Sequence, residues 1–253
     1  MRLANMTWPQ VETYFKTRDM VILPIGSIEC HGRHMPLGTD TIVPDKILDL
    51  FEEKNNDILI MPTMPYGATG FLAPFPGTVD IGDEALYLFL RNTVSAMKSH
   101  GAKKFLALNG HGGNTKALER VGLELSNEGC LLAIFSWFTN VQEMNPAWKG
   151  AHGDGQETAA VMGIDPSLVD MSEIESDMTL NDLSPQLKAS TFRNINFKGV
   201  NITVPRSYKF VTKNGCMGPL PRKDATAEEG KKMLKAMADY MLDFAAEFEK
   251  VKF

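Results

Sequence analysis

The sequence predicts an α/β fold in which helices cover both faces of a mainly parallel sheet. Short apolar runs rich in β-branched residues alternate with longer segments of helical periodicity along the chain. The first apolar run is hydrophobic throughout rather than at every second position, which is typical of a strand buried on both faces. Polar residues suited to chemistry follow several of these runs, at the strand ends where open parallel sheets bind their ligands.

The first part of the chain supplies two strands and one helix. The run MVILPIG at 20–26 is short, β-branched and ended by glycine, so it predicts a buried strand. Residues 43–56 carry apolar side chains at helical spacing, with Pro44 near the start of the helix. The run at 57–64 predicts a second strand, which Pro62 and Pro65 would end.

The alternation continues through the rest of the chain. Residues 82–101 predict an amphipathic helix with acids at its start and a glycine cap at its end. Residues 103–110, 114–129 and 130–138 predict a strand, a helix and a strand. Residues 226–251 predict a long amphipathic helix, in which Thr226 and Glu229 would form a capping box.

The segment 171–224 has weak periodicity and is rich in Ser, Asn, Pro and Lys. Two interpretations remain open: a hairpin with arms at 192–199 and 200–212, or a long ordered loop that closes over a site. The chain has no internal repeat, low-complexity tract or linker. We therefore expect a single domain over residues 1–253.

Composition excludes several classes of function. Hydrophobic residues make up 43% and charged residues 23% of the 253 positions, and the net charge of -5 gives no reason to expect nucleic-acid binding. No apolar run reaches the roughly 18 residues of a membrane span, and the N-terminus lacks the apolar region of a secretory signal. Three widely spaced cysteines argue against a disulfide scaffold. We expect a cytoplasmic protein with no membrane or nucleic-acid partner.

Histidines and acids concentrate in three segments that follow predicted strands. GSIECHGRHMPLGTD at 26–40 holds Glu29, His31, His34 and Asp40, and four of the five histidines of the chain fall in the three segments. NGHGGN at 109–114 contributes His111, whose flanking glycines let the backbone approach a ligand closely. AHGDGQETAA at 151–160 contributes His152 and Glu157 near the start of a helix.

This combination favours a metal centre. Imidazole and carboxylate are the ligands that Zn, Mn and Fe(II) accept. Glu29 and His31 are two residues apart, so both side chains point to one side of an extended stretch. Gly38 and Pro36 allow a tight reversal that returns Asp40 to the same place. Two divalent ions held by a bridging carboxylate would activate a water molecule and polarise a substrate carbonyl.

Each of these residues also has a structural interpretation when taken alone. Asp40 and Glu157 suit a turn and a helix start, and His31, His34 and His111 suit a surface or a loop. NGHGGN resembles a phosphate-binding loop but lacks the GxGxxG spacing and the Walker lysine. Three such segments on successive strand ends seldom coincide without a site, so we favour the metal centre.

Two further features have both a structural and a functional interpretation. Cys30 lies between two candidate ligands but has no separate catalytic partners in the sequence, so we interpret it as a bystander that lines the site. The late segment is locally basic, which fits a solvated face or a lid that contacts an anionic substrate; its basic residues are Arg206, Lys209, Lys213, Arg222 and Lys223.

The first motif, LPIGSIECHGRHMPLGTD at 23–40, resembles the signature of the creatininase (creatinine amidohydrolase) family. NGHGGN at 109–114, the H-x4-E-T pattern of residues 152–158, FPGTVD at 75–80 and NGCMGP with DATAEEG near the end occur in the order of that family. The resemblance covers nearly the whole chain. It implies a three-layer α/β/α sandwich and a metal-dependent hydrolase that cleaves amide C–N bonds.

The resemblance also implies a set of site residues. Glu29, His31, Asp40 and His111 would bind two divalent ions of Zn, Mn or Fe, with Asp40 bridging them. His152 would transfer a proton near the substrate. Substrates of the family include cyclic amides, formamides and a peptide, so the expected partner is a small molecule. Relatives are often hexameric, which implies a homo-oligomer.

Departures from the family pattern limit this transfer. A glutamate ligand of creatininase proper corresponds to Gly113 here, and the tyrosine that contacts creatinine corresponds to Gly112. Cys30 and Arg33 replace the usual glutamine and proline, and no histidine precedes FPGTVD. These departures argue against creatinine as the substrate. They favour Glu157 as the carboxylate that completes the second metal site.

The same departures motivate an alternative function from another class. A family member without turnover would keep the pocket to bind a metabolite or a metal. Saturable, metal-dependent hydrolysis distinguishes the enzyme from this binding protein.

Overall fold

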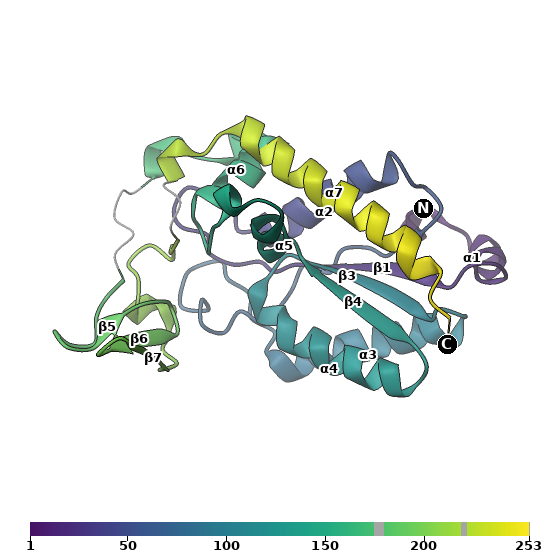
Figure 1. Ribbon diagram of the computed structural model, residues 1–253, viewed down its shortest axis with the longest axis horizontal. Coiled ribbons are helices and arrows are strands. Elements are labelled where there is room, and N and C mark those ends of the chain that lie inside the picture. The colour runs from purple at the N-terminus through teal and green to yellow at the C-terminus, as the bar shows by residue number, and fades with distance from the viewer. Residues whose placement is uncertain (175–179, 219–221, 253) are drawn as a thin grey trace.

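A four-stranded, wholly parallel sheet forms the centre of the computed structural model, which describes residues 1–174, 180–218 and 222–252 (Figure 1). Its strands are β1 (Met20–Ile25), β2 (Leu59–Ile60), β3 (Lys104–Asn109) and β4 (Leu131–Ser136), in the order β2-β1-β3-β4. All residues of β1 and β3 are buried, as their unbroken apolar runs predict. The register pairs Ile25 with Asn109 and Asn109 with Ser136, so these three strands end at one edge.

Helices cover both faces of this sheet and confirm the three-layer α/β/α architecture (Figure 1). One layer contains α2 (Thr39–Glu52), α5 (Trp137–Met144), α6 (Gly155–Ile164) and α7 (Ala227–Glu249). The other contains α3 (Asp83–Ser99) and α4 (Thr115–Asn127), and the short α1 (Trp8–Phe15) contributes Tyr14 to the same core. Short 3-10 turns complete the described elements: Leu3–Asn5, Gly112–Asn114, Pro146–Trp148, Pro166–Leu168, Met171–Glu173, Tyr208–Phe210 and Arg222–Asp224.

Alternation along the strands divides the apolar side chains into two cores. Ile22, Leu106 and Leu108 pack under the α2–α6–α7 layer. Leu23 and Phe105 point to the opposite face and pack against α3 and α4. Each core holds fully buried aliphatic and aromatic side chains, so the sheet is anchored from both sides.

Several element boundaries differ from the sequence-based expectation. The strand expected at 57–64 is regular only over Leu59–Ile60, and an isolated bridge continues the pairing at Met64, because the intervening proline lacks an N–H for the ladder. The strand expected at 130–138 ends at Ser136, where α5 begins. Of the capping box expected at the start of α7, only one half is formed. The Thr226 side chain accepts a hydrogen bond from the backbone N–H of Glu229, but the Glu229 carboxylate accepts hydrogen bonds from Trp148 and Lys232 instead.

Helix α2 begins at Thr39, four residues before the expected start, and this change matters for the site. Asp40 therefore lies in the first helical turn rather than in a loop reversal. Pro44 lies inside the helix and cannot donate to the carbonyl of Asp40, four residues earlier. The backbone of Gly26 and Gly110 occupies the space beside that carbonyl: a Cβ at either position would lie 2.2 or 2.0 Å from the Asp40 oxygen.

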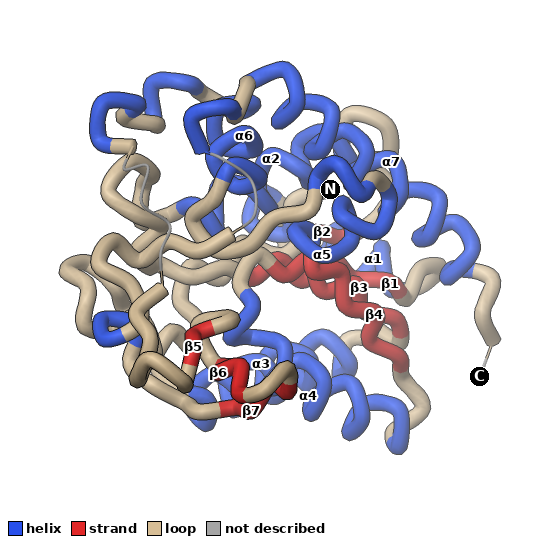
Figure 2. The backbone as a smooth tube through the Cα atoms, turned by 60° about the vertical axis from the view of Figure 1, so that its left-hand side comes forward, coloured by secondary structure: helices blue, strands red, loops and turns tan. Residues whose placement is uncertain are grey.

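The segment between α6 and α7 forms the hairpin expected there. Strands β5 (Lys188–Ala189), β6 (Asn194–Phe197) and β7 (Val200–Thr203) make a small antiparallel sheet beside the main body (Figures 1 and 2). Lys198 and Gly199 turn the hairpin with positive φ angles of 50° and 84°. The second arm is shorter than expected, because β7 ends two residues before Pro205.

The chain beyond β7 then returns toward the main body. Tyr208 stacks on Phe71 there, with ring centroids 5.3 Å apart. The segment is thus both a hairpin and a cover.

In the described ranges, no helix combines the length and the apolar character needed to cross a bilayer.

Candidate metal centre

Three chain segments bring acids and imidazoles together at the carboxyl edge of the sheet. Glu29 and His31 follow β1, His111 follows β3, and Asp40 enters from the first turn of α2. Glu157 comes from the first turn of α6, on the layer that also contains α2. These five side chains are buried, with exposed fractions between 0 and 9%.

The five side chains form two groups that share Asp40. Nδ1 of His111 lies 3.1 Å from an oxygen of Glu29 and 3.1 Å from Oδ2 of Asp40. Nε2 of His31 lies 2.9 Å from Oδ1 of Asp40 and 3.7 Å from Oε2 of Glu157. Asp40 therefore presents one oxygen to each group. Within each group, all three candidate ligand atoms lie within 4.8 Å of one another, close enough to share one ion.

Each histidine of the site is oriented by a backbone carbonyl. Nδ1 of His31 lies 3.1 Å from the carbonyl of Glu29, and Nε2 of His111 lies 3.0 Å from the carbonyl of Ala68. Nε2 of His152 lies 2.7 Å from the carbonyl of Cys30. A carbonyl can only accept, so each of these nitrogens carries a proton, and the other ring nitrogen, once it has lost its own proton, can present a lone pair to the cluster. This is how metal-binding histidines are usually held.

The cluster contains buried polar atoms that make ion-pair contacts but no hydrogen bond of good geometry. Both carboxylate oxygens of Glu29 and Nε2 of His31 are buried without a hydrogen bond of acceptable geometry among the described residues. Buried polar groups are normally paired, because an unpaired group keeps its full desolvation cost. A carboxylate and an imidazole aimed at the same space therefore fit a cation that the protein is built to receive.

The electrostatics of the metal-free site show how strongly its members interact. Burial raises the pKa of Glu29, and it raises that of Glu157 to about 8. Burial opposes protonation of His31, yet Asp40, Glu157 and Glu29 outweigh it and raise its pKa to about 10.

The pKa values of His111 and Asp40 also reflect a competition between burial and neighbouring charges. Burial also opposes protonation of His111, but Glu29 and Asp40 raise its pKa well above the usual value. Burial alone would raise the pKa of Asp40, but His31 and His111 hold it well below its ordinary value. Without metal, the cluster thus holds protons in place of cations.

His152 lies beside the cluster and is held in the neutral form. Its Nδ1 lies 3.6 Å from an oxygen of Glu29, and it is also grouped with Glu29 and His31 within 4.8 Å. Burial, reinforced by the charge of His31, lowers the pKa of His152 to about 3. The imidazole is therefore neutral at pH 7.

Glu157 is held in place by the start of its helix. Its Oε2 accepts a hydrogen bond of 2.6 Å from the backbone N–H of Gly153, while Asp154 caps the helix through the backbone of Gln156. Burial among these N–H groups fixes the carboxylate toward His31. The geometry brings Glu157 into the second group, where the sequence-based hypothesis expected it.

Gly113 has no room for a side chain in this protein. A Cβ there would lie 2.1 Å from the carbonyl oxygen of Ala68 and 2.4 Å from Nε2 of His111. The hydrogen bond that orients His111 thus passes through the space that a side chain at position 113 would need. Among the described residues, Glu157 is the carboxylate that lies beside His31 and Asp40.

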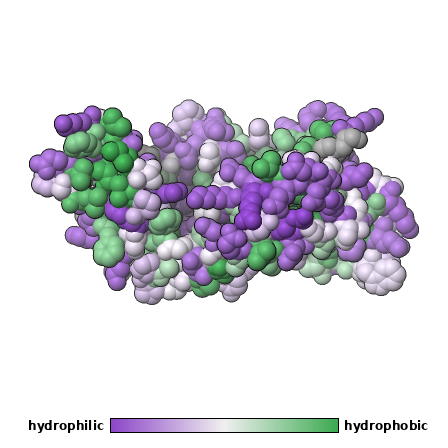
Figure 3. All heavy atoms as spheres, turned by 90° about the horizontal axis from the view of Figure 1, so that it is seen from below, coloured by the Kyte–Doolittle hydropathy of each residue, from purple (hydrophilic) through white to green (hydrophobic). Residues whose placement is uncertain are grey.

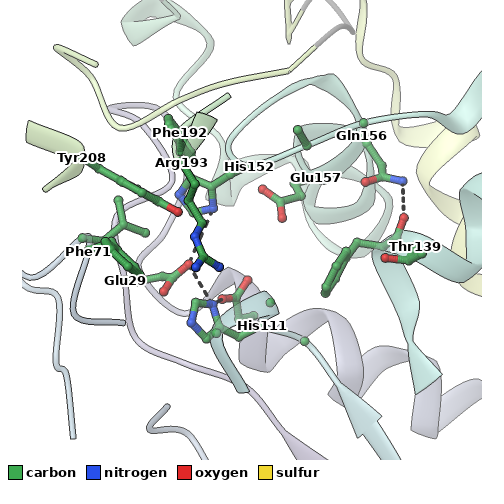
Figure 4. Close-up of a pocket in the computed structure, with 18 of the residues that line it drawn as sticks. Glu29, Phe71, His111, Thr139, His152, Gln156, Glu157, Phe192, Arg193 and Tyr208 are labelled. Carbon is green, nitrogen blue, oxygen red and sulfur yellow. Dashed lines mark hydrogen bonds and ion pairs between the residues drawn. The ribbon is translucent and has the colours of Figure 1, made fainter. Parts of the chain in front are cut away.

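Above the cluster lies a pocket of about 430 Å³, a volume suited to a small molecule (Figure 4). Glu29, Asp40, His111, His152 and Glu157 line its floor and sides, and Phe71, Phe138, Phe192, Arg193 and Tyr208 add a mostly aromatic wall. The ring of Tyr208 stacks on Phe192 at 4.1 Å between centroids, and Phe192 meets His152 edge-on at 5.8 Å.

The wall residues were missed by the sequence analysis. Phe192 and Arg193 lie just before β6, and Tyr208 lies beyond β7. Phe192 and Tyr208 lie within the arms of the predicted hairpin, and the sequence could not show which of their side chains face the pocket.

One expectation, that Cys30 lines the site, is corrected, and two neighbouring residues of the first motif also lie outside the cluster. His34 faces away from the cluster, with Nε2 2.9 Å from the hydroxyl of Thr158. The thiol of Cys30 does not line the pocket, because its Sγ contacts the carbonyls of Gly32 and Asn214. Arg33 forms an ion pair with Glu173 at the surface.

Of the two interpretations of the basic segment, the described lining of the pocket does not support the lid. Lys209, Lys213 and Lys223 do not line the pocket, and neither does Arg206. The side chain of Arg222 lies outside what the structure describes. The positive charge at the pocket belongs to Arg193 instead.

Comparisons with known proteins agree with this geometry. The family model Creatininase, described as creatinine amidohydrolase, matches residues 4–245. The chain is 33% identical over 178 residues to the mycofactocin precursor peptide peptidase of Mycolicibacterium smegmatis, covering 67% of this chain and 68% of that protein. It is 26% identical over 195 residues to the creatinine amidohydrolase of Pseudomonas putida, covering 68% and 75%.

Solved structures show the same fold. A crystal structure of creatinine amidohydrolase aligns with a TM-score of 0.75 at 20% identity, covering 99% of this chain and 98% of that one. Creatininase structures described as a Zn-Zn type and as an Mn form each align with a TM-score of 0.73 at 21% identity, covering 99% of this chain and 98% or 99% of theirs.

Proposed function

The chain belongs to the creatininase family of hydrolases acting on C–N bonds, and on this basis we propose that it hydrolyses a small cyclic amide or a formamide with the help of two divalent metal ions. The observation that carries the proposal is the pair of three-residue groups that share Asp40. Buried atoms of Glu29 and His31 that make no hydrogen bond of good geometry support it, because such atoms suit a cation.

We assign the ligands by group. Glu29, Asp40 and His111 would hold one ion, and His31, Asp40 and Glu157 the other. Imidazole and carboxylate donors fit Zn, Mn or Fe. The zinc and manganese forms of the creatininase structures support the first two metals. Three protein ligands per ion leave a position open for substrate, as catalytic sites require.

The side chains around the proposed ions have separate roles in the reaction. Bound divalent ions would lower the pKa of a coordinated water and polarise the substrate carbonyl. His152 presents its unprotonated Nδ1 to the pocket, so it can accept a proton there and deliver it to the leaving nitrogen. Glu157 lies on the same side and holds its carboxylate against His31. Phe192 and Tyr208 exclude water from the space above.

The pocket favours a substrate other than creatinine. Gly112 and Gly113 line it without side chains, so the contacts that a tyrosine and a glutamate would provide are missing. One relative is named as a precursor peptide peptidase and another as a creatinine amidohydrolase, so similar chains serve different amides. We therefore propose a compact amide or formamide that fits about 430 Å³.

The test combines metal analysis with turnover. Protein purified without chelator should contain close to two equivalents of divalent metal, and it should hydrolyse a member of a panel of lactams and formamides. Chelation should remove the activity, and added Zn²⁺ or Mn²⁺ should restore it. Absence of stoichiometric metal would refute the proposal. Tight binding without metal-dependent turnover would favour the alternative, a family member that only binds its ligand.

We also propose that the protein is a cytoplasmic homo-oligomer. Cys30, Cys130 and Cys216 are all buried free thiols, which suits a reducing compartment. Figure 3 shows a hydrophobic area over the β5–β7 end, where Phe197, Val200 and Ile202 are 37, 62 and 48% exposed. Light scattering coupled to gel filtration should report an assembly, a hexamer being the state that the resemblance implies, and Val200→Lys should weaken it.

A further inference from the structure

The wall of the pocket carries one strongly basic side chain with no role in the proposed metal chemistry. Arg193 lies between the buried Phe192 and strand β6, and it is the one lysine or arginine among the described residues that line the pocket. In Figure 4 its side chain extends from the hairpin into the pocket, on the same side as Tyr208. An arginine placed this way needs a physical explanation.

The local backbone fixes where Arg193 begins. Its carbonyl accepts a hydrogen bond of 2.8 Å from the N–H of Val204, and its N–H donates to the hydroxyl of Thr191 at 3.2 Å. The guanidinium carbon lies 5.6 Å from the centroid of Phe71, within the range of a cation–π contact. The guanidinium therefore contacts the aromatic wall, while the residue as a whole stays exposed and accessible to a ligand.

The N–H groups of the Arg193 guanidinium are free to bind a ligand. Within the described part of the chain, no hydrogen bond or ion pair is formed by its nitrogens, although it carries five N–H groups in a planar fork. This fork matches the two oxygens of a carboxylate. The other arginines with ordered partners, such as Arg2 and Arg91, use the same fork on surface acids of the protein itself.

Tyr208 supplies a second donor beside it. Burial raises the pKa of Tyr208 to about 12, and the charge of Arg193 opposes that rise, so the two groups interact. The phenol therefore stays protonated at neutral pH. Its hydroxyl group faces the pocket in Figure 4. A guanidinium and a phenol on one wall can bind a single anionic group together.

The charge of the pocket floor permits such an anion. The three carboxylates of Glu29, Asp40 and Glu157 would repel it if they stood alone. Two bound divalent ions would carry more positive charge than the three carboxylates carry negative charge. With the ions bound, the floor would no longer repel an anion at the wall. A single arginine matches the single charge of a carboxylate better than the double charge of a phosphate.

We propose that Arg193, assisted by Tyr208, is a specificity residue that binds a carboxylate on the substrate, so that the amide processed here carries an acid group. This inference rests on the proposed function for its reaction. It deepens that function by naming the substrate class: a carboxylate-bearing lactam or N-formyl amino acid. The reacting carbonyl would face the metal floor while the carboxylate rests on the hairpin wall.

Matched pairs of ligands test the proposal by binding, without requiring turnover. Pyroglutamate and pyroglutamamide differ only in the carboxylate, and so do N-formylglycine and N-formylglycinamide. Affinities for protein with metal bound are measured by ligand-observed NMR titration, with inorganic phosphate as a separate arm. A hydrogen-bonded charge pair predicts that the acid of at least one pair binds about 10- to 100-fold more tightly than its amide.

Variants separate a direct contact from a general charge effect. Arg193→Gln should abolish the preference for the acid, and Arg193→Lys should restore it only in part, because lysine lacks the planar fork. Lys198→Gln is the matched control: it removes one positive charge from the turn of the same hairpin but does not line the pocket. The preference should survive in that variant, and the metal content should be unchanged in all three.

The possible failures are distinguishable. Equal binding of acid and amide, a preference that survives Arg193→Gln, or no binding of either pair would overturn the role of Arg193. Tighter, Arg193-dependent binding of phosphate than of every acid would overturn the carboxylate assignment. Equally efficient hydrolysis of acid and amide would overturn the inference and leave the amidohydrolase intact. A clear acid preference with no hydrolysis of any amide would instead refute the proposed function.

Discussion

The floor and the wall of the pocket are built in opposite ways. Glu29, His31, Asp40 and His111 follow fully buried strands or begin a buried helix, and backbone carbonyls fix their rings. The wall comes from the hairpin side, where β7 is exposed along its whole length. Chemistry that needs ligand atoms held within tenths of an ångström is thus placed on the rigid core. The recognition of the substrate that we propose would instead lie on an exposed segment that can change independently.

Among the changes to the floor, Asp40→Asn is expected to have the largest effect on metal content and activity. This change removes the carboxylate shared by both groups, so both sites should lose metal and activity should fall by more than about 100-fold. Elemental analysis and an amide hydrolysis assay measure the two losses. Asp49→Asn on the same helix is the control, because its surface ion pair with Arg2 contributes little. Two metals retained in Asp40→Asn would contradict the bridging role.

Glu157→Gln should affect one site only. Occupancy should fall from two metals toward one, with an affinity loss at the second site of at least about 10- to 100-fold. The amide keeps the shape of the carboxylate, so the fold should be preserved. Glu143→Gln, an exposed acid on α5, is the matched control. A variant that keeps two tightly bound ions and full activity would show that Glu157 is only a helix-start acid.

The same floor should release protons when it takes up metal. His31 has a pKa near 10 and Glu157 one near 8 in the metal-free site, and His111 is also raised, so protons are present at pH 7. Metal must displace them, so apparent affinity should rise with pH by about tenfold per unit for each proton released. Calorimetry of the chelated protein in buffers of different ionisation enthalpy measures this. Uptake without proton release between pH 6.5 and 8 would contradict the proton-holding floor.

The smallest effect should come from the wall. Phe192→Ala removes the stacking on Tyr208 and the edge contact with His152. The loss of one such aromatic pair should raise KM by about 5-fold and leave two metals bound. Phe210→Ala, an exposed aromatic residue of the same segment but outside the pocket lining, is the control. Loss of metal in Phe192→Ala would show that wall and floor are not independent.

Much of the fold could be predicted because hydrophobic periodicity is a local property. The runs at 20–26 and 103–110 gave buried parallel strands, and the hairpin turn at Lys198 and Gly199 falls at the end of the first expected arm. Boundaries were less predictable. Helix α2 starts at Thr39 because Gly26 and Gly110 make room for the Asp40 carbonyl, and these contacts join residues far apart in the chain.

The sequence by itself determined the chemistry available to this protein: acids and imidazoles after parallel strands, in an order typical of one family. Only the tertiary structure decided which of them meet. His34 and Cys30 stand in the same motif as Glu29 and His31 yet turn away, because Thr158 and Asn214 bind them from other parts of the chain. Arg193 has no sequence signal at all. Its place over the metal floor follows from the path of a hairpin back to the sheet edge, and that path depends on packing between distant residues rather than on local propensity.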